Sequence, residues 1–260
     1  MRTVVKILSI FILISILTLS VNANSTIGWY CKRTNDHTQP VLDSYLAKIG
    51  DNKNLIWVDK KHSSFSDDEK VIYLTFDAGY ENGNIEKILD ILKEEDVKAT
   101  FFILDNLIYS NKDLVERMIN EGHLIGNHTC KHRDMSRVAD IEIFRRELAS
   151  LEELFKENFG VEMSKFYRPP EGKLSIENLE WAEKLGYKTV MWSFAYADWD
   201  NRNQMAPDKA MDKVMSHLHN GEILLLHPTS STNAKIMKCF IQELKKEGYK
   251  FGTVDEIEIS

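Results

Sequence analysis

The sequence predicts an α/β fold in which parallel strands form a sheet or a barrel. From Lys70 onward, apolar runs of strand length alternate with helical patterns, which is typical of parallel strands joined by right-handed crossovers. This periodicity alone favours an open sheet and a (β/α) barrel equally. Polar residues suited to catalysis follow several different strands, which favours the barrel. The sequence also lacks the glycine-rich phosphate loop that a doubly wound sheet normally carries at its crevice.

Short runs rich in β-branched and aromatic residues are expected to form the strands. They are Val71–Phe76, Ala99–Leu104, Leu124–Asn127, Phe166–Tyr167, Thr189–Phe194, Glu222–Leu226 and Tyr249–Val254. The first run ends at Asp77, and the glycines at Gly79 and Gly83 allow the backbone to turn away. We therefore expect the Asp77 carboxylate at the rim of the sheet.

Helical patterns lie between these runs. Three of them show an apolar stripe with helical spacing, and several end at a glycine that favours the left-handed terminal position. The stripes begin at Ile85, Leu114 and Ile141, and the other patterns cover Leu174–Leu185, Met205–Leu218 and Ala234–Glu247.

Residues 1–23 are typical of a secretory signal peptide. Two basic residues, Arg2 and Lys6, precede an apolar run, and Val21–Ala23 supplies small residues for cleavage after Ala23. An uncleaved membrane anchor is the alternative, but the apolar run is short for a full span. Cleavage removes two positive charges and no negative one, so the formal charge changes from -7 to -9. An acidic exported protein is a poor candidate for nucleic-acid binding, and we expect an extracytoplasmic monomer without a membrane span after cleavage.

Residues 24–69 contain no pattern long enough for a separate domain. We interpret them as an N-terminal extension with a short helix near Leu42–Ile49, packed on the main body through Trp29, Tyr30 and Trp57. The main domain is expected over 70–254, followed by a tail at 255–260. The cysteine count is odd and argues against a disulfide scaffold, but it leaves a bridge between the first and the last open: they are Cys31, Cys130 and Cys239.

Two histidines four residues apart, His128 and His132, follow the strand run that ends at Asn127. On a helical turn they would share one face and could reach a single divalent ion. Two unrelated surface histidines are the plainer interpretation, but the strand-end carboxylate of Asp77 favours a metal site. Cys130 would point away from the shared face on such a turn, so we interpret it as a packing residue.

The segment from Arg168 to Gly172 is stiff because two prolines fix its backbone. An arginine held in this way can steer a carboxylate, and a backbone N–H just past the prolines, near Glu171, can donate to a developing oxyanion. A rigid connector with a surface arginine is the alternative, and this motif alone does not decide between the two.

His227 follows an apolar strand run, so it is either a core histidine or an acid–base group with an orienting carboxylate. Asp198, which follows the Thr189–Phe194 run, is the natural partner for His227. Asp200 is the second choice.

With these residues in place, Lys70–Val254 resembles the polysaccharide deacetylase family, carbohydrate esterase family 4, whose shared unit is the NodB homology domain. The resemblance rests on motifs in the family's order: Thr75–Gly79, His128–His132, Arg168–Gly172, Asp198-Trp199 and Leu226-His227. The segments Thr75–Gly83 and Arg168–Gly172 and the leader from Gly28 to Pro40 are most similar to the PdaA-type δ-lactam-biosynthetic de-N-acetylases. Those enzymes act on N-acetylmuramic acid in spore-cortex peptidoglycan.

The resemblance implies a distorted (β/α) barrel of about seven strands and metal-dependent hydrolysis of an N-acetyl group. It implies that His128 and His132 hold a divalent ion, usually zinc, and that Asp77 is the general base and a further candidate ligand. The leaving amine would be protonated by His227, which Asp198 would hold, and Arg168 would orient Asp77. The residues expected at the substrate and oxyanion positions are Tyr80, Glu171, Gly172 and Trp199. The expected partner is a peptidoglycan glycan strand in the cell wall or spore cortex.

One position departs from the family pattern, because Ala78 stands where the family's second acid normally ligates the metal. A methyl group cannot coordinate, so we expect water or Asp77 to complete the shell and metal affinity to be weaker. Glu171 also replaces an aromatic or basic residue often found there, which leaves substrate selectivity open. The alternatives are a deacetylase of N-acetylglucosamine chains or acetylated xylan and, in another class, a metal-poor protein that only binds glycan. The presence of both a base and an acid argues against the last of these.

Overall fold

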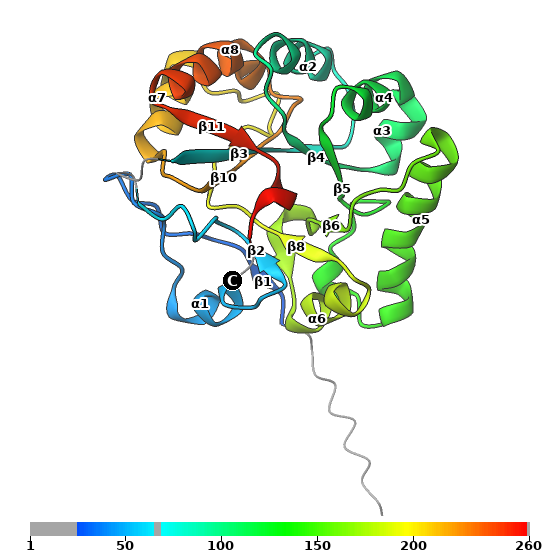
Figure 1. Ribbon diagram of the computed structural model, residues 1–260. Coiled ribbons are helices and arrows are strands. Elements are labelled where there is room, and N and C mark those ends of the chain that lie inside the picture. The colour runs from blue at the N-terminus through cyan, green and yellow to red at the C-terminus, as the bar shows by residue number, and fades with distance from the viewer. Residues whose placement is uncertain (1–24, 65–68, 259–260) are drawn as a thin grey trace, which may run out of the picture.

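The computed structural model describes residues 25–64 and 69–258, so the predicted signal peptide lies outside the described residues. A sheet of parallel strands occupies the centre, and helices pack around its outside (Figure 1). The strands are β2 (Leu55–Ile56), β3 (Lys70–Ala78), β4 (Thr100–Ile103), β5 (Leu124–Asn127), β6 (Phe166–Tyr167), β8 (Lys188–Val190), β9 (Phe194–Ala195), β10 (Glu222–Leu226) and β11 (Tyr249–Gly252). Parallel strands covered by helices confirm the predicted barrel-type α/β class.

The sheet follows the order β2-β8-β6-β5-β4-β3-β10-β9, and β11 pairs with the first half of β3. The neighbours of β3 are in register with its apolar residues, for example Leu224 with Leu74 and Phe101 with Phe76. This register brings the carboxyl ends of β3, β4, β5 and β10 to one rim, where polar residues that follow each strand meet.

The predicted strand Thr189–Phe194 is wrong, because the chain forms two strands there. The Met191 amide donates to the Ile56 carbonyl at 2.7 Å, on the β2 side of the sheet. Two residues later, the Ser193 amide donates to the Ile223 carbonyl at 3.0 Å, on the β10 side. Residues 191–193 therefore cross from one end of the strand order to the other and span the opening of the barrel.

Most helices lie where the apolar spacing predicts them. They are α2 (Ile85–Glu94), α4 (Lys112–Asn120), α5 (Ile141–Phe159), α6 (Ile176–Lys184), α7 (Pro207–His217) and α8 (Ser231–Lys246), and the short α3 (Asp105–Ser110) is an addition. The stripe that begins at Ile85 is fully buried in the core. Gly160 ends α5 with φ of 71°, the left-handed conformation that glycine adopts without strain.

The N-terminal extension is built into the sheet instead of only covering it. Its strand β1 (Ile27–Gly28) pairs antiparallel with β7 (Lys173–Leu174), its strand β2 joins β8, and α1 (Ser44–Gly50) confirms the predicted short helix. Trp29 and Trp57 are buried with ring centroids 5.9 Å apart, as expected. The expectation for Tyr30 is wrong, since its side chain is 60% exposed.

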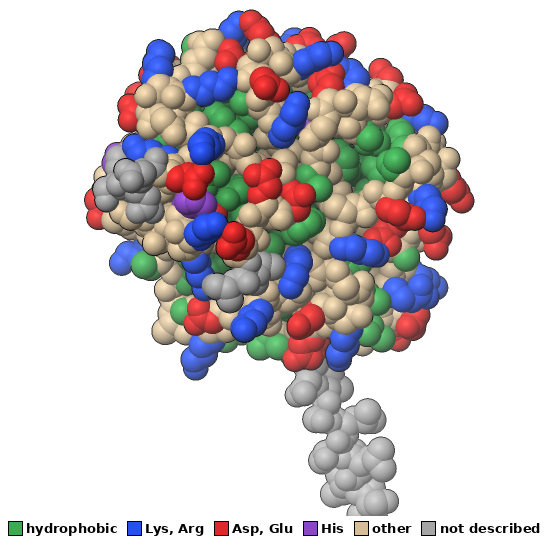
Figure 2. All heavy atoms as spheres, viewed as in Figure 1, with side chains coloured by type: hydrophobic (Ala, Val, Ile, Leu, Met, Phe, Trp, Pro, Cys, Tyr) green, Lys and Arg blue, Asp and Glu red, His purple; other side chains and the backbone are tan. Residues whose placement is uncertain are grey.

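The surface in the view of Figure 2 carries interspersed acidic and basic side chains without a large patch of one sign. No helix in the described part of the chain has the length and apolarity needed to cross a membrane. All three cysteines are free thiols, so the bridge that the sequence leaves open does not form: they are Cys31, Cys130 and Cys239.

Candidate active site

A cleft of about 820 Å³ opens at the rim where the strands end. Most of the residues singled out in the sequence line it: Asp77, Tyr80, His128, His132, Glu171, Gly172, Trp199 and His227. Arg168 and Asp198 are buried and contact two of these lining residues from behind. The structure thus brings all the sequence-predicted site residues to one place.

Asp77, near the end of β3, is held by Arg168. Nη1 of this arginine donates to Asp77 Oδ1 at 2.9 Å, while Nε and Nη2 donate to the Val190 and Met191 carbonyls at 3.1 Å each. The guanidinium also lies 4.2 Å from the centroid of the Phe102 ring. Because Arg168 is fully buried and each of its three nitrogens donates a hydrogen bond, the orientation of Asp77 is fixed.

The electrostatic environment keeps Asp77 ionised. Burial raises the pKa of this carboxyl, but the charges of His128, Arg168 and His227 oppose burial and together hold the pKa below its ordinary value. Asp77 is therefore a carboxylate at neutral pH, the form that accepts a proton.

His128 and His132 face each other across 5.1 Å between ring centroids. The predicted helical turn is wrong, because Thr129 and His132 have φ of 72° and 53°, both left-handed. Side-chain hydrogen bonds stabilise this loop, since the Thr129 amide donates to Asn127 Oδ1 at 2.8 Å and the His132 amide to Thr129 Oγ1 at 2.9 Å. The loop brings the two imidazoles together by a route that helical spacing does not describe.

Cys130 lies between the two histidines and packs away from the cleft. Its thiol donates to Asp105 Oδ2 at 3.2 Å and it contacts the main hydrophobic core. Burial raises the pKa of this thiol to about 12, so it stays protonated. The interpretation of Cys130 as a packing residue is confirmed.

His128 has the form that metal ligation requires. Its Nδ1–H donates to the Arg168 carbonyl at 2.8 Å, which leaves Nε2 unprotonated and 3.5 Å from Asp77 Oδ2. Burial lowers the pKa of His128 to about 4, so the ring is neutral at neutral pH. An imidazole that donates its other N–H to a carbonyl is the usual arrangement of a histidine ligand.

The side chains of His128, His132 and Asp77 are of the types that bind a divalent ion, but they are few for a complete coordination shell. The two imidazoles and the carboxylate lie near one another in the cleft. Their spacing is too wide to hold an ion together, and this is true of every group of three His, Cys, Asp or Glu side chains in residues 25–64 and 69–258. Ala78, the residue after Asp77, is fully buried and offers no donor. Water must therefore complete the coordination of any ion bound by His128 and His132.

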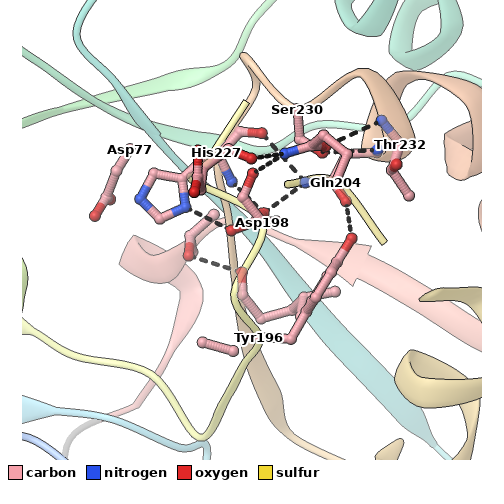
Figure 3. A network of polar contacts seen from close by, with 12 residues as sticks. Asp77, Tyr196, Asp198, Gln204, His227, Ser230 and Thr232 are labelled. Carbon is pink, nitrogen blue, oxygen red and sulfur yellow. Dashed lines mark hydrogen bonds and ion pairs between the residues drawn. The ribbon is translucent and has the colours of Figure 1, made fainter. Parts of the chain in front are cut away.

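His227, directly after β10, is held by Asp198. His227 Nδ1 lies 2.7 Å from Asp198 Oδ1, and the His227 amide donates to Oδ2 at 2.7 Å. Asn233 adds a third bond to the same carboxylate at 2.6 Å. Figure 3 shows the imidazole between this carboxylate and Asp77. Asp200, the second choice from the sequence, instead accepts from the Arg202 amide at 3.0 Å.

The Asp198 carboxylate favours the protonated form of His227. Burial lowers the pKa of the imidazole, but the hydrogen bond and the charge of Asp198, with a smaller contribution from the charge of Asp77, outweigh burial and raise this pKa above its ordinary value. His227 is thus suited to donate a proton from the nitrogen that faces the cleft.

The remaining sequence-predicted residues form the outer part of the cleft. Glu171 and Gly172 have φ of 58° and 64°, and a Cβ at Gly172 would lie 2.4 Å from the Trp192 ring, so only glycine fits there. The Glu171 carboxylate pairs with Lys173. Tyr80 accepts a hydrogen bond from Asn201 at 2.7 Å, and Trp199 is 62% exposed. These two aromatic side chains border the cleft opening.

Sequence reasoning missed one wall of the cleft. This wall comes from the N-terminal extension and from the segment that crosses the barrel opening, and its residues are Trp29, Tyr30, Cys31, Arg33 and Trp192. Trp29 anchors it, because its indole N–H donates to the Trp192 carbonyl at 2.8 Å and its amide to the Gly172 carbonyl at 2.9 Å. The sequence marks the leader from Gly28 to Pro40 only by its resemblance to the PdaA-type enzymes, and only the fold shows that its residues border the site.

Comparison with known proteins gives consistent matches. A family profile described as polysaccharide deacetylase matches residues 65–190. The peptidoglycan-N-acetylmuramic acid deacetylase PdaA of Bacillus subtilis is 36% identical over 234 residues, 90% of this chain and 86% of that protein. A peptidoglycan-N-acetylglucosamine deacetylase of Bacillus cereus is 33% identical over 204 residues, 76% of this chain and 72% of that protein.

A solved structure shows the same architecture. The structure of Bacillus subtilis PdaA, described as a family 4 carbohydrate esterase, superposes with a TM-score of 0.83 at 36% identity. The superposition covers 90% of this chain and 97% of that one. The barrel and its cleft therefore define a hydrolase of the kind that deacetylates polysaccharides. The chain belongs to the polysaccharide deacetylase family, carbohydrate esterase family 4.

Proposed function

We propose that this enzyme removes the N-acetyl group of N-acetylmuramic acid in peptidoglycan, on the route to muramic δ-lactam. The observation that carries the proposal is the pair of opposed groups in one cleft, an ionised Asp77 held by Arg168 and a protonated His227 held by Asp198. The similarity over 90% of the chain to a relative named for N-acetylmuramic acid supports this substrate. We infer that the enzyme is exported and acts in the cell wall or spore cortex.

Asp77 is the proposed general base. Arg168 fixes the orientation of its carboxylate, and the lowered pKa keeps it unprotonated at neutral pH. The carboxylate accepts a proton from the water that attacks the acetyl carbonyl.

His227 is the proposed general acid. Asp198 holds Nδ1 at 2.7 Å and raises the pKa of the ring, so the other nitrogen carries a proton toward the cleft. Delivery of this proton to the amide nitrogen lets the sugar leave as a free amine, with acetate as the second product.

The developing oxyanion requires a donor at the opposite side of the acetyl group. The Gly172 amide is already committed to the Pro169 carbonyl at 3.2 Å, and prolines have no N–H. The Glu171 amide is therefore the candidate donor, and its left-handed backbone sets its direction.

We infer that His128 and His132 hold a divalent ion, zinc by donor type, with Asp77 as the nearest further ligand. When bound, such an ion supplies Lewis acidity that polarises the acetyl carbonyl. The neutral state of His128 and the bond from its Nδ1 to the Arg168 carbonyl support this assignment.

Deacetylation of N-acetylglucosamine chains is the second candidate, supported by the Bacillus cereus relative that is named for this sugar. Acetate release from glycan that contains muramic acid, compared with chitooligosaccharide and acetylated xylan, separates the candidates. We expect the highest kcat/KM for the muramic acid glycan. Faster release from chitooligosaccharide would overturn the proposed substrate, and binding without release from any of the three would indicate a non-catalytic glycan-binding protein.

A further inference from the structure

Arg33 is a cationic side chain that the mechanism above does not use. It belongs to the N-terminal extension and lines the same cleft as Asp77 and His227. The family profile begins at residue 65, so Arg33 lies outside the part of the chain that the family as a whole shares. A residue in this position suits a role in the choice of substrate better than a role in the common chemistry.

The backbone near the acid side of the cleft positions Arg33. Its Nη2 donates to the Ala195 carbonyl, and its guanidinium lies 4.9 Å from the centroid of the Phe194 ring. Ala195 pairs in register with Leu225, two residues before His227. Arg33 is therefore held one strand away from the proposed general acid, at the exposed rim of the cleft.

The charge of Arg33 is not matched by a carboxylate. Within the described residues no ion pair includes Arg33, whereas two other cations close to the cleft are paired, Arg168 with Asp77 and Lys173 with Glu171. An arginine has five N–H donors, and one bond to a carbonyl leaves most of them free for a ligand. A positioned guanidinium with free donors suits a carboxylate, which it can bind through two parallel hydrogen bonds.

The sugar proposed as substrate carries such a carboxylate. Muramic acid differs from glucosamine by a lactyl ether on C3, the ring carbon next to the one that bears the acetamide. A group that recognises the lactyl carboxylate must therefore line the same cleft as the catalytic residues. It must also lie to one side of the point where the acetamide reacts. Arg33 meets both conditions.

We propose that Arg33 forms an anion subsite that binds the lactyl carboxylate of muramic acid and so selects this sugar over glucosamine. The inference rests on the proposed function, because it concerns the same cleft. It assigns to the extension a substrate-binding role in addition to its structural one.

The test measures binding and acetate release separately. The probes are a tetrasaccharide of alternating N-acetylglucosamine and N-acetylmuramic acid with free lactyl carboxylates, the same tetrasaccharide with both carboxylates converted to primary amides, and chitotetraose. The variants are Arg33→Gln and, as the matched control, Lys32→Gln, which removes the same charge from the neighbouring exposed residue that does not line the cleft. Calorimetry gives Kd, and an acetate assay gives kcat and KM.

For the wild-type protein we expect Kd for the free-acid probe to be about tenfold lower than for the amide probe. Arg33→Gln should lose this preference by weakening only the free-acid complex, and should leave chitotetraose binding unchanged. Lys32→Gln should behave as wild type. Arg33→Lys keeps the charge but lacks the planar set of guanidinium donors, so it should retain part of the preference. A partial preference in this variant shows that the loss in Arg33→Gln does not come from a folding defect.

The outcomes separate the subsite from the reaction. A free-acid preference that survives in Arg33→Gln, or that is absent in the wild type, overturns the subsite even if muramic acid glycan is deacetylated. An Arg33-dependent preference without acetate release overturns the proposed reaction and supports the subsite. Rising ionic strength should reduce the wild-type preference, because the contact is at an exposed rim.

Discussion

The cleft contains two pairs of histidine and aspartate, and the two imidazoles are driven in opposite directions. His128 lies 3.5 Å from the Asp77 carboxylate, and burial lowers its pKa to about 4. His227 lies 2.7 Å from Asp198, which overcomes burial and raises its pKa. The same two residue types thus give a neutral imidazole on one side and a protonated one on the other.

The partners of each carboxylate explain the difference. Asp77 is hydrogen-bonded to the fully buried Arg168 and lies 3.5 Å from His128, so its charge raises the pKa of His128 by less than burial lowers it. Asp198 accepts its other hydrogen bonds from neutral donors, the Asn233 amide and the His227 backbone. Its full charge therefore acts on His227. Near-complete burial at His128 and the direct hydrogen bond to Asp198 at His227 therefore separate the two imidazoles.

The largest effect is expected for Asp77→Asn on the base side. The amide keeps the shape of the carboxylate but cannot accept a proton from water, so kcat should fall by about a thousandfold. The variant also leaves the buried Arg168 without its counter-charge, which should lower the free energy of unfolding by about 3 kcal/mol. Acetate release, measured below the melting temperature with glycan binding as control, checks this. A near-normal kcat would remove Asp77 as the base.

Replacement of both His128 and His132 by alanine tests whether the neutral imidazoles hold a metal. We expect the wild-type protein to retain one equivalent of zinc after dialysis and the double variant to retain none, because both proposed imidazole ligands are gone. Elemental analysis measures this directly, without reference to activity. Cys130→Ala is the matched control, since Cys130 lies between the two histidines but packs into the core. Unchanged zinc in the double variant would place the ion elsewhere.

Asp198→Asn removes the carboxylate that hydrogen-bonds to His227 on the acid side. Without a dedicated carboxylate, His227 loses the partner that orients it and favours its protonated form, so kcat should fall by about a hundredfold with little change in KM. Asp200→Asn is the matched control, because the Asp200 carboxylate accepts from the Arg202 amide, while Asp198 holds His227. Equal effects of the two substitutions on kcat would contradict a specific role for Asp198.

Much of the fold follows from local sequence. The apolar spacing predicts the long helices and most strands because burial of one face governs both. The division between β8 and β9 was not predictable, since Met191 and Ser193 lie in one apolar run and only their distant partners, Ile56 and Ile223, differ. The strand β2 was missed for a similar reason, because two residues carry no periodic signal.

The candidate site was predictable where a residue follows a strand. Asp77, His128 and His227 come directly from β3, β5 and β10 and meet at one rim for that reason. The loop that carries His132 depends on two left-handed residues and on the Thr129 hydroxyl, which helical spacing does not anticipate. Arg33 was missed because its place depends on the path of the extension over Trp192, a tertiary feature without a local pattern.

A third imidazole sharpens the comparison, because His123 is buried without a carboxylate partner. Its Nδ1 accepts from the Ala99 amide at 3.2 Å, and its Nε2 has no hydrogen-bond partner within the described structure. Burial, with a smaller contribution from Lys98, lowers the pKa of His123 from 6.5 to about 4. Burial is therefore the largest cause of the lowered pKa at His123, as it is at His128.

The unfolded chain binds a proton at His123 below about pH 6.5, whereas the folded chain does so only near pH 4. The stability contributed by the neutral ring is thus fully present above pH 6.5 and is lost as the pH falls toward 4, by at most about 3 kcal/mol. His123→Asn keeps an acceptor for the Ala99 amide but cannot be protonated, so its free energy of unfolding should decline less over this range. Urea denaturation at several pH values measures the difference. Parallel curves for the two proteins would show that His123 has the same pKa in the folded and the unfolded chain, and that burial does not lower this pKa.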